Sequence, residues 1–154
     1  MDRAATPSVE ASRQVRDTCL CLHAQRAARV LARRFDKALA PFGLTNGQFS
    51  LMMAANGPQP TALSRLAALL GADRTTLTAA LKPLSREGLV EVTPDPDDGR
   101  VRRVALTAAG RTRLAAAHGA WRRAHAELEG ELDGLDQERL RRELRQVAGA
   151  PGGR

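Results

Sequence analysis

Residues 61–106 read TALSRLAALLGADRTTLTAALKPLSREGLVEVTPDPDDGRVRRVAL, and this stretch decides the fold. Its first part predicts a short helix over 61–70, because apolar side chains recur at steps of three and four residues: Leu63, Leu66, Ala67 and Leu70. Gly71 then permits a turn, and Asp73 is a suitable N-cap for a second helix that ends near Gly88. Two short helices joined by a glycine turn indicate a helix-turn-helix motif.

The second of these helices has two chemically different faces. Leu77, Leu81 and Leu84 recur at helical spacing and are predicted to face the core. The other side carries the candidate DNA-binding residues Arg74, Thr75, Thr76, Thr78 and Lys82. Arginine can bind a guanine edge through its planar guanidinium, and threonine can bind a base or a phosphate. We expect this face to read the major groove of DNA; the alternative is a polar face that contacts only water.

A charged hairpin follows the second helix. Residues 89–92 and 101–106 are predicted strands, and the segment 93–99 between them is rich in turn-forming residues. Arg100 and Arg102 come after an acidic tip, where arginines can reach the minor groove and its negative potential. Asp98 is the candidate partner that holds one of these arginines in place. A recognition helix followed by a basic hairpin predicts a winged helix-turn-helix.

Amphipathic helices are predicted on both sides of this motif. Residues 12–40 contain neither Gly nor Pro and carry a broad apolar face, which indicates a long helix after a flexible arm at 1–11. Suitable N-caps begin the other predicted helices: Thr45, Thr107 and Asp136. Residues 151–154 are expected to be a frayed tail. The predicted fold class is mainly α with a small β-hairpin wing.

Two parts of the chain resemble the MarR family of multiple antibiotic resistance regulators. Residues 69–78 together with 84–90 resemble the recognition region of that family. Residues 95–100, continuing into 104–110, resemble its wing signature. One departure is Gly99, because many members of the family carry an arginine at this position.

The resemblance extends in element order over most of the chain, and it implies both architecture and function. It implies one MarR-like domain over 12–150, in which 45–106 form the winged helix-turn-helix lobe. The helices of 12–40 and 107–148 would interlock with a second copy to form a homodimer. Such a dimer would bind a pseudo-palindromic operator in double-stranded DNA. Members usually repress nearby genes and release DNA on a small-molecule or oxidant signal.

The composition supports an anionic partner. The formal net charge is +7, and all basic residues except Lys37 and Lys82 are arginine. A GC-rich genome would produce the same arginine bias, so a sequence-indifferent nucleic-acid binder is the alternative. No nucleophile with a base and no glycine-rich phosphate loop is visible, so we expect no enzymatic activity and no cofactor. The absence of a signal peptide or a membrane-spanning run predicts a cytoplasmic protein without a membrane partner.

Three sensing chemistries are conceivable. Cys19 and Cys21 lie where hydroperoxide-sensing relatives place a reactive thiol, but the chain contains no tyrosine to assist it. Two residues apart on a helix, they would point away from each other and could not form a disulfide within one subunit. The sequence gives less support to metal sensing. Cys19 and His23 form one candidate ligand pair and His118 and His125 another, but neither pair has an obvious third ligand. The family default is a small organic effector near Met52, Met53 and Trp121.

Overall fold

The computed structural model describes residues 6–149. Its elements are α1 (Val9–Thr18), α2 (Leu20–Leu39), the 3-10 helix η1 (Ala40–Phe42), α3 (Asn46–Ala55), β1 (Thr61–Ala62), α4 (Leu63–Leu70), α5 (Arg74–Arg86), β2 (Val90–Pro94), β3 (Arg102–Leu106), α6 (Ala108–Glu131) and α7 (Gln137–Ala148). The predicted fold class is confirmed, and the predicted tail at 151–154 lies outside the described residues. None of the helices within 6–149 is long and apolar enough to cross a membrane.

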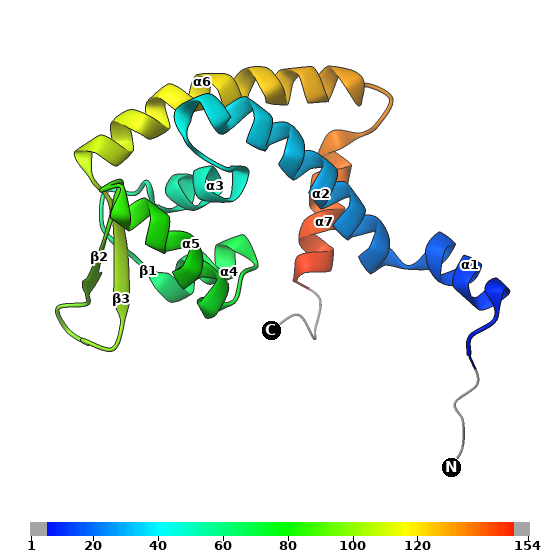
Figure 1. Ribbon diagram of the computed structural model, residues 1–154, viewed down its shortest axis with the longest axis horizontal. Coiled ribbons are helices and arrows are strands. Elements are labelled where there is room, and N and C mark those ends of the chain that lie inside the picture. Colours follow the sequence, from blue (N-terminus) through cyan, green and yellow to red (C-terminus); the bar gives the residue numbers. More distant parts are fainter. Residues whose placement is uncertain (1–5, 150–154) are drawn as a thin grey trace, which may run out of the picture.

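Two long helices form one layer, and the winged lobe lies beneath one end of it. Figure 1 shows α6 running along the top with α2 descending beside it, while α3, α4, α5 and the sheet lie together below. The largest fully buried side chains come from both parts: Leu39, Leu51, Met52, Leu66, Leu84, Leu89 and Val104. Arg34 of α2 also donates two hydrogen bonds to Glu131 of α6, at 2.6 and 2.7 Å. Apolar packing and this long-range pair fix α2 against α6.

Side-chain caps begin the helices at the predicted positions. Thr45 and Gln48 form a reciprocal capping box at the start of α3. Asp73, Thr107 and Asp136 each accept a backbone hydrogen bond from the first turn of α5, α6 and α7, respectively. Because each cap satisfies an otherwise unpaired N–H group, these boundaries follow from local sequence.

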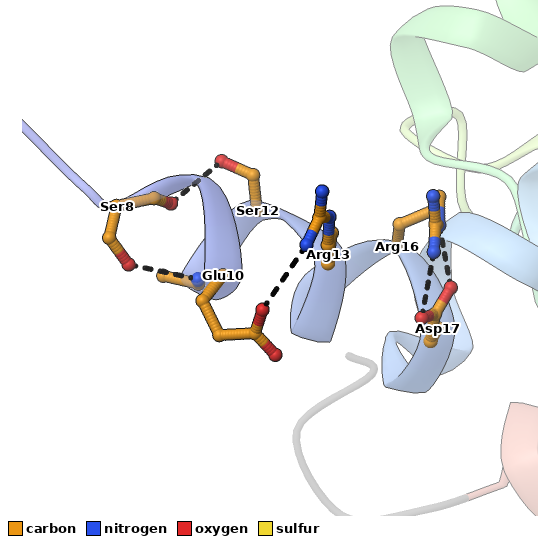
Figure 2. A network of polar contacts seen from close by, with 7 residues as sticks. Ser8, Glu10, Ser12, Arg13, Arg16 and Asp17 are labelled. Atoms are coloured by element: carbon orange, nitrogen blue, oxygen red, sulfur yellow. Dashed lines mark hydrogen bonds and ion pairs between the residues drawn. The ribbon is translucent and has the colours of Figure 1, made fainter.

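The N-terminal segment departs from the prediction of an arm at 1–11. Helix α1 begins at Val9, because the Ser8 side chain accepts a hydrogen bond from the Ala11 N–H at 3.1 Å. Figure 2 shows this cap, together with the Glu10–Arg13 ion pair (3.6 Å) and the Arg16–Asp17 contact (2.6 Å). These local interactions extend the helical segment three residues beyond the predicted start.

The single helix predicted over 12–40 is also wrong, because the chain leaves helical geometry at Cys19. Its backbone has φ −74° and ψ 105°, and its Sγ accepts a hydrogen bond from the Leu22 N–H at 3.4 Å. Cys19 therefore acts as the N-cap of α2. On the other side, the Thr18 hydroxyl donates to the Gln14 carbonyl at 2.8 Å and closes the last turn of α1. Side chains able to satisfy both helix ends allow the break.

The wing is a three-stranded sheet rather than a two-stranded hairpin. Its strand order is β1-β3-β2, with antiparallel pairing throughout. Thr61 and Ala62, predicted to open a helix, pair instead with Val104 and Arg103 of β3. Helix α4 consequently starts at Leu63 and has no side-chain N-cap. The partner strand lies some forty residues downstream, so local periodicity could not indicate this pairing.

Gly110 allows α6 to pack directly on the backbone that precedes β2. A Cβ at this position would overlap the Leu89 carbonyl oxygen and lie 2.9 Å from the carbonyl carbon. We expect Gly110→Ala to lower the free energy of unfolding by about 1–3 kcal/mol, because backbone atoms cannot move aside as a side chain can.

Gly119→Ala is the matched control for this stability measurement. It lies on the same helix, where a Cβ would meet only the Arg123 Nη1 at 3.8 Å. Higher helix propensity should make this variant neutral or more stable by up to about 1 kcal/mol. Denaturant unfolding at one protein concentration compares the two, and equal stability of both variants would contradict the close packing at Gly110.

Candidate nucleic-acid interface

Helix α5 presents its polar face to solvent. Leu77, Leu81 and Leu84 are buried in the core, as predicted. The five candidate contact residues on this helix are all exposed: Arg74, Thr75, Thr76, Thr78 and Lys82. The surface is therefore open to a partner along more than two helical turns.

The start of α5 is held by a compact hydrogen-bond arrangement. Gly71 adopts φ 61°, a left-handed conformation that ends α4 and turns the chain. Asp73 then accepts hydrogen bonds from the Thr76 N–H at 2.7 Å and from the Thr76 hydroxyl at 2.8 Å. The Thr76 N–H, followed by its hydroxyl, lowers the pKa of Asp73, so this cap stays charged. Thr76 thus has a structural partner within the helix.

The other two threonines, Thr75 and Thr78, differ from each other in whether their hydroxyl groups have a hydrogen-bond partner within the protein. The Thr78 hydroxyl donates to the Arg74 carbonyl oxygen at 2.7 Å, which leaves its methyl group and its oxygen lone pairs for an external partner. The Thr75 hydroxyl has no hydrogen-bond partner among residues 6–149 and is free to donate. The sequence could not separate these three residues, because all three fall on exposed positions of one helix.

The structure brings three predicted arginines to one hollow, called here the α5 groove. Arg74 from α5 meets Arg100 and Arg102 from the wing, around a volume of about 440 Å³ that also includes Ser64 of α4. Lys82 does not belong to the groove and lies two turns further along α5. Guanidinium groups are able to bind phosphate oxygens and base edges, and the α5 groove has three of them in its lining.

Asp98 lies at the tip of the wing beside Arg100. Its Oδ1 accepts a hydrogen bond from the Arg100 N–H at 3.0 Å and lies 3.8 Å from the Arg100 guanidinium Nε. The Arg100 side chain is 96% exposed. Asp98 therefore shapes the turn through the backbone and leaves the guanidinium projecting into solvent.

The main polar support of the wing is Asp95, which the sequence reasoning missed. Its carboxylate is only 7% exposed, accepts hydrogen bonds from the Asp97 and Asp98 N–H groups at 2.8 and 3.2 Å, and pairs with Arg103. The Arg103 Nη1 also donates to the Pro60 carbonyl oxygen at 3.1 Å. An aspartate whose side chain accepts a hydrogen bond from the backbone N–H two residues later forms a common type of turn, the Asx turn. This turn preference of aspartate could have drawn attention to Asp95.

Asp95→Asn is expected to loosen the wing and weaken DNA binding. The Asp97 N–H, and then the Arg103 guanidinium, lower the pKa of Asp95. A carboxyl group with a lowered folded-state pKa stabilises the fold above its ordinary pKa, and this contribution is lost as pH falls through the lowered value. The variant should therefore melt below the wild type at neutral pH, with a difference that shrinks in acid. A pH-independent difference would show that charge is not the cause.

The two cysteines lie at the junction of α1 and α2. Cys19 is partly buried and Cys21 is exposed. The Cys21 Sγ accepts a hydrogen bond from the Gln25 side-chain amide at 3.0 Å. Within residues 6–149, no group of three or more His, Cys, Asp or Glu side chains could hold a metal ion.

A mainly apolar cavity of about 330 Å³, called here the Trp121 cavity, lies between α3, α4 and α6. Phe49, Met53, Leu70 and Trp121 line it, and Ser50 contributes a hydroxyl. Of the three predicted effector contacts, Met53 and Trp121 are therefore in the lining, whereas Met52 is fully buried in the core. His118 and His125 flank the Trp121 ring, with centroids at 5.9 and 4.8 Å.

The fold and this surface define a winged helix-turn-helix protein, and comparison with known proteins identifies its family. The sequence model of the MarR family matches residues 44–101. The Mycobacterium tuberculosis transcriptional regulator MosR, solved in complex with DNA, is 40% identical, with a TM-score of 0.77. That match covers 85% of this chain and 94% of MosR. The chain belongs to the MarR family of transcriptional regulators.

Two more distant structures share the fold. CouR from Rhodococcus jostii RHA1, bound to p-coumaroyl-CoA, is 22% identical with a TM-score of 0.73; 88% of this chain and 95% of CouR are covered. A cysteine-to-serine mutant of MarR from E. coli, complexed with operator DNA, is 24% identical with a TM-score of 0.75; 87% and 96% are covered. A comparison with curated protein sequences finds no match.

Proposed function

We propose that this chain is a sequence-specific DNA-binding repressor that acts as a homodimer in the cytoplasm and has no enzymatic activity. The observation that carries the proposal is the convergence of Arg74, Arg100 and Arg102 on the α5 groove. Structures of MosR with DNA and of E. coli MarR with operator DNA support it by similarity. His118 and His125 both pack against the Trp121 ring. This contact is not the pairing of a histidine base with a nucleophile that many enzymes use, so it does not support a catalytic role.

Each candidate residue has a role that its position suggests. Arg74, at the N-terminus of α5, would bind a base edge, with Thr75 and Thr78 beside it. Lys82 would bind a DNA phosphate beyond the α5 groove, further along helix α5, and Arg102 would bind a phosphate near the wing. Arg100 would enter the minor groove from the tip of the wing. Thr76 would act through Asp73, by holding the start of the helix.

The homodimer is supported by apolar side chains that one protomer leaves in contact with water. Large hydrophobic residues are exposed along α2 and α7: Leu20, Leu22, Val30, Leu31, Leu140, Leu144 and Val147. A second copy would cover these faces and give the assembly a two-fold axis. The operator would then be pseudo-palindromic, with half-sites about one helical turn apart.

A competition experiment with upstream DNA tests the proposed function. The full-length protein should bind DNA from upstream of its own gene at least about a thousandfold more tightly than unrelated DNA at physiological salt. Arg100→Ala should weaken this binding, because it removes the projecting guanidinium. Equal affinity for both DNAs would indicate a sequence-indifferent binder, and full affinity of the variant would place the wing off the DNA.

The proposed signal is a small organic molecule in the Trp121 cavity. This cavity lies between the winged lobe and α6, so its occupant would alter the position of α5 relative to the dimer helices. Trp121 is the only tryptophan, which makes its fluorescence a direct reporter. A compound that dissociates the DNA complex should also quench Trp121, and Met53→Trp should reduce its affinity by filling the cavity.

Oxidation is a second candidate signal, favoured by the helix break at Cys19 and the exposure of Cys21. A peroxide would oxidise one thiol to a sulfenic acid and be reduced to an alcohol or water. Mass spectrometry of the peroxide-treated protein should detect this product while DNA binding falls. If both thiols stay reduced, the oxidant proposal fails and the repressor proposal is unaffected.

A further inference from the structure

A third cavity, called here the Arg65 cavity, lies on the side of α4 away from the α5 groove. Its volume is about 490 Å³, which is within the usual range of small-molecule sites, about 300–1,000 Å³. Ala54 of α3, the segment 57–62, Arg65 and Leu69 of α4, and Arg103 of β3 line it. It has no lining residue in common with the α5 groove.

The walls of the Arg65 cavity combine an apolar surface with two guanidinium groups. Pro58 and Pro60 form one wall, and their rings restrict the backbone, so this wall is held in shape. Leu69 forms part of another wall and is 69% exposed, although it is a large apolar side chain. An apolar ligand body would cover this leucine and remove its surface from water.

The charges of the cavity do not balance. Arg103 is neutralised by the buried carboxylate of Asp95, and its Nη1 donates to the Pro60 carbonyl oxygen. Arg65 is exposed and has no carboxylate within 4.0 Å among residues 6–149. One positive charge is therefore left uncompensated beside an apolar wall.

We propose that the Arg65 cavity binds a small amphipathic monoanion. Its carboxylate lies against the guanidinium groups of Arg65 and Arg103, and its apolar body lies on Pro58 and Leu69. The Arg65 cavity meets the Trp121 cavity at Ala54 and Leu69, but only the Arg65 cavity is lined by charged side chains, so the carboxylate distinguishes this ligand from the occupant of the Trp121 cavity.

Arg103 links this cavity to the wing. The guanidinium that faces the ligand also pairs with Asp95, and Asp95 accepts the hydrogen bonds that fix the backbone of residues 97 and 98. A bound carboxylate competes with Asp95 for Arg103 and loosens the turn that carries Arg100. This coupling rests on the proposed function of the wing, whereas the binding of the anion does not.

Calorimetry with octanoate tests the binding, and octanamide is the uncharged comparison. The full-length protein should bind one octanoate per cavity, and octanamide at least about tenfold more weakly, because a charge-assisted hydrogen bond is lost. Arg65→Gln should weaken octanoate about tenfold, whereas Arg65→Lys should retain most of the affinity. Arg122→Gln, a charge-matched control on α6, should have no effect.

Three results would overturn the proposal. One is no saturable octanoate binding at millimolar concentration, and another is equal affinity for octanoate and octanamide. The third is loss of octanoate binding in Met53→Trp, which would place the ligand in the Trp121 cavity. The coupling is tested separately: octanoate should weaken DNA binding by the wild type but not by Arg65→Gln. Unchanged DNA affinity with saturated octanoate would refute the coupling alone.

Discussion

Leu144→Glu is expected to separate the homodimer into monomers and to lower operator affinity at least about a hundredfold. Leu140, Leu144 and Val147 recur at helical spacing along α7, and Leu144 is 53% exposed in one protomer. A carboxylate at this position would be buried without a partner in the proposed interface, which costs several kcal/mol. A monomer would bind only one half-site and lose the avidity of two linked sites, about 10²–10⁴-fold.

Light scattering after size exclusion measures the mass, and fluorescence anisotropy with labelled operator measures the affinity. Gln146→Glu is the matched control, because it introduces the same charge on the same helix, two residues away and on the opposite side. The control should remain dimeric and bind the operator normally. If the Leu144→Glu variant remains dimeric and binds the operator with full affinity, α7 is not part of the dimer interface.

Local chemistry made much of the winged lobe predictable. The helix starts followed from side chains that accept a hydrogen bond within one turn, such as Asp73 and Thr107. The two faces of α5 followed from the spacing of Leu77, Leu81 and Leu84. In both cases the cause and its effect lie within a few residues of each other, so a sequence pattern contains the information.

Features that depend on distant residues were not predictable in the same way. β1 exists because Thr61 and Ala62 pair with a strand that begins at Arg102. The support of the wing by Asp95 likewise depends on Arg103 and on the Pro60 carbonyl. Each requires knowledge of which segments meet in space, and no periodicity contains that information.

Helix α2 shows a second limit of prediction from the sequence. The sequence predicted its apolar face, and Phe35 on that face is buried against the rest of the protomer. Leu20 and Leu31, which fall on the same side of the helix by their spacing, remain exposed. Hydrophobic spacing identifies the residues that need cover, but it does not distinguish cover by the same chain from cover by a second copy.

Arg74→Ala is expected to cause the largest loss of operator affinity among single substitutions in the α5 groove. Removal of an arginine that binds a base edge costs about 1–3 kcal/mol per half-site. A homodimer carries the change twice, at sites far apart, so the losses should add to about 2–6 kcal/mol. Preference at one base pair in each half-site should disappear at the same time, which an operator library with single-base changes would detect.

Arg74→Lys separates base reading from simple charge. Lysine keeps the positive charge but lacks the planar guanidinium, so it should preserve the salt dependence of binding while losing the base preference. Arg123→Ala removes the same charge from an exposed position on α6 that does not line the α5 groove, and it should change neither property. If Arg74→Ala weakens all operator variants equally and only reduces the salt dependence, Arg74 contacts a phosphate, and base reading must come from Thr75 and Thr78.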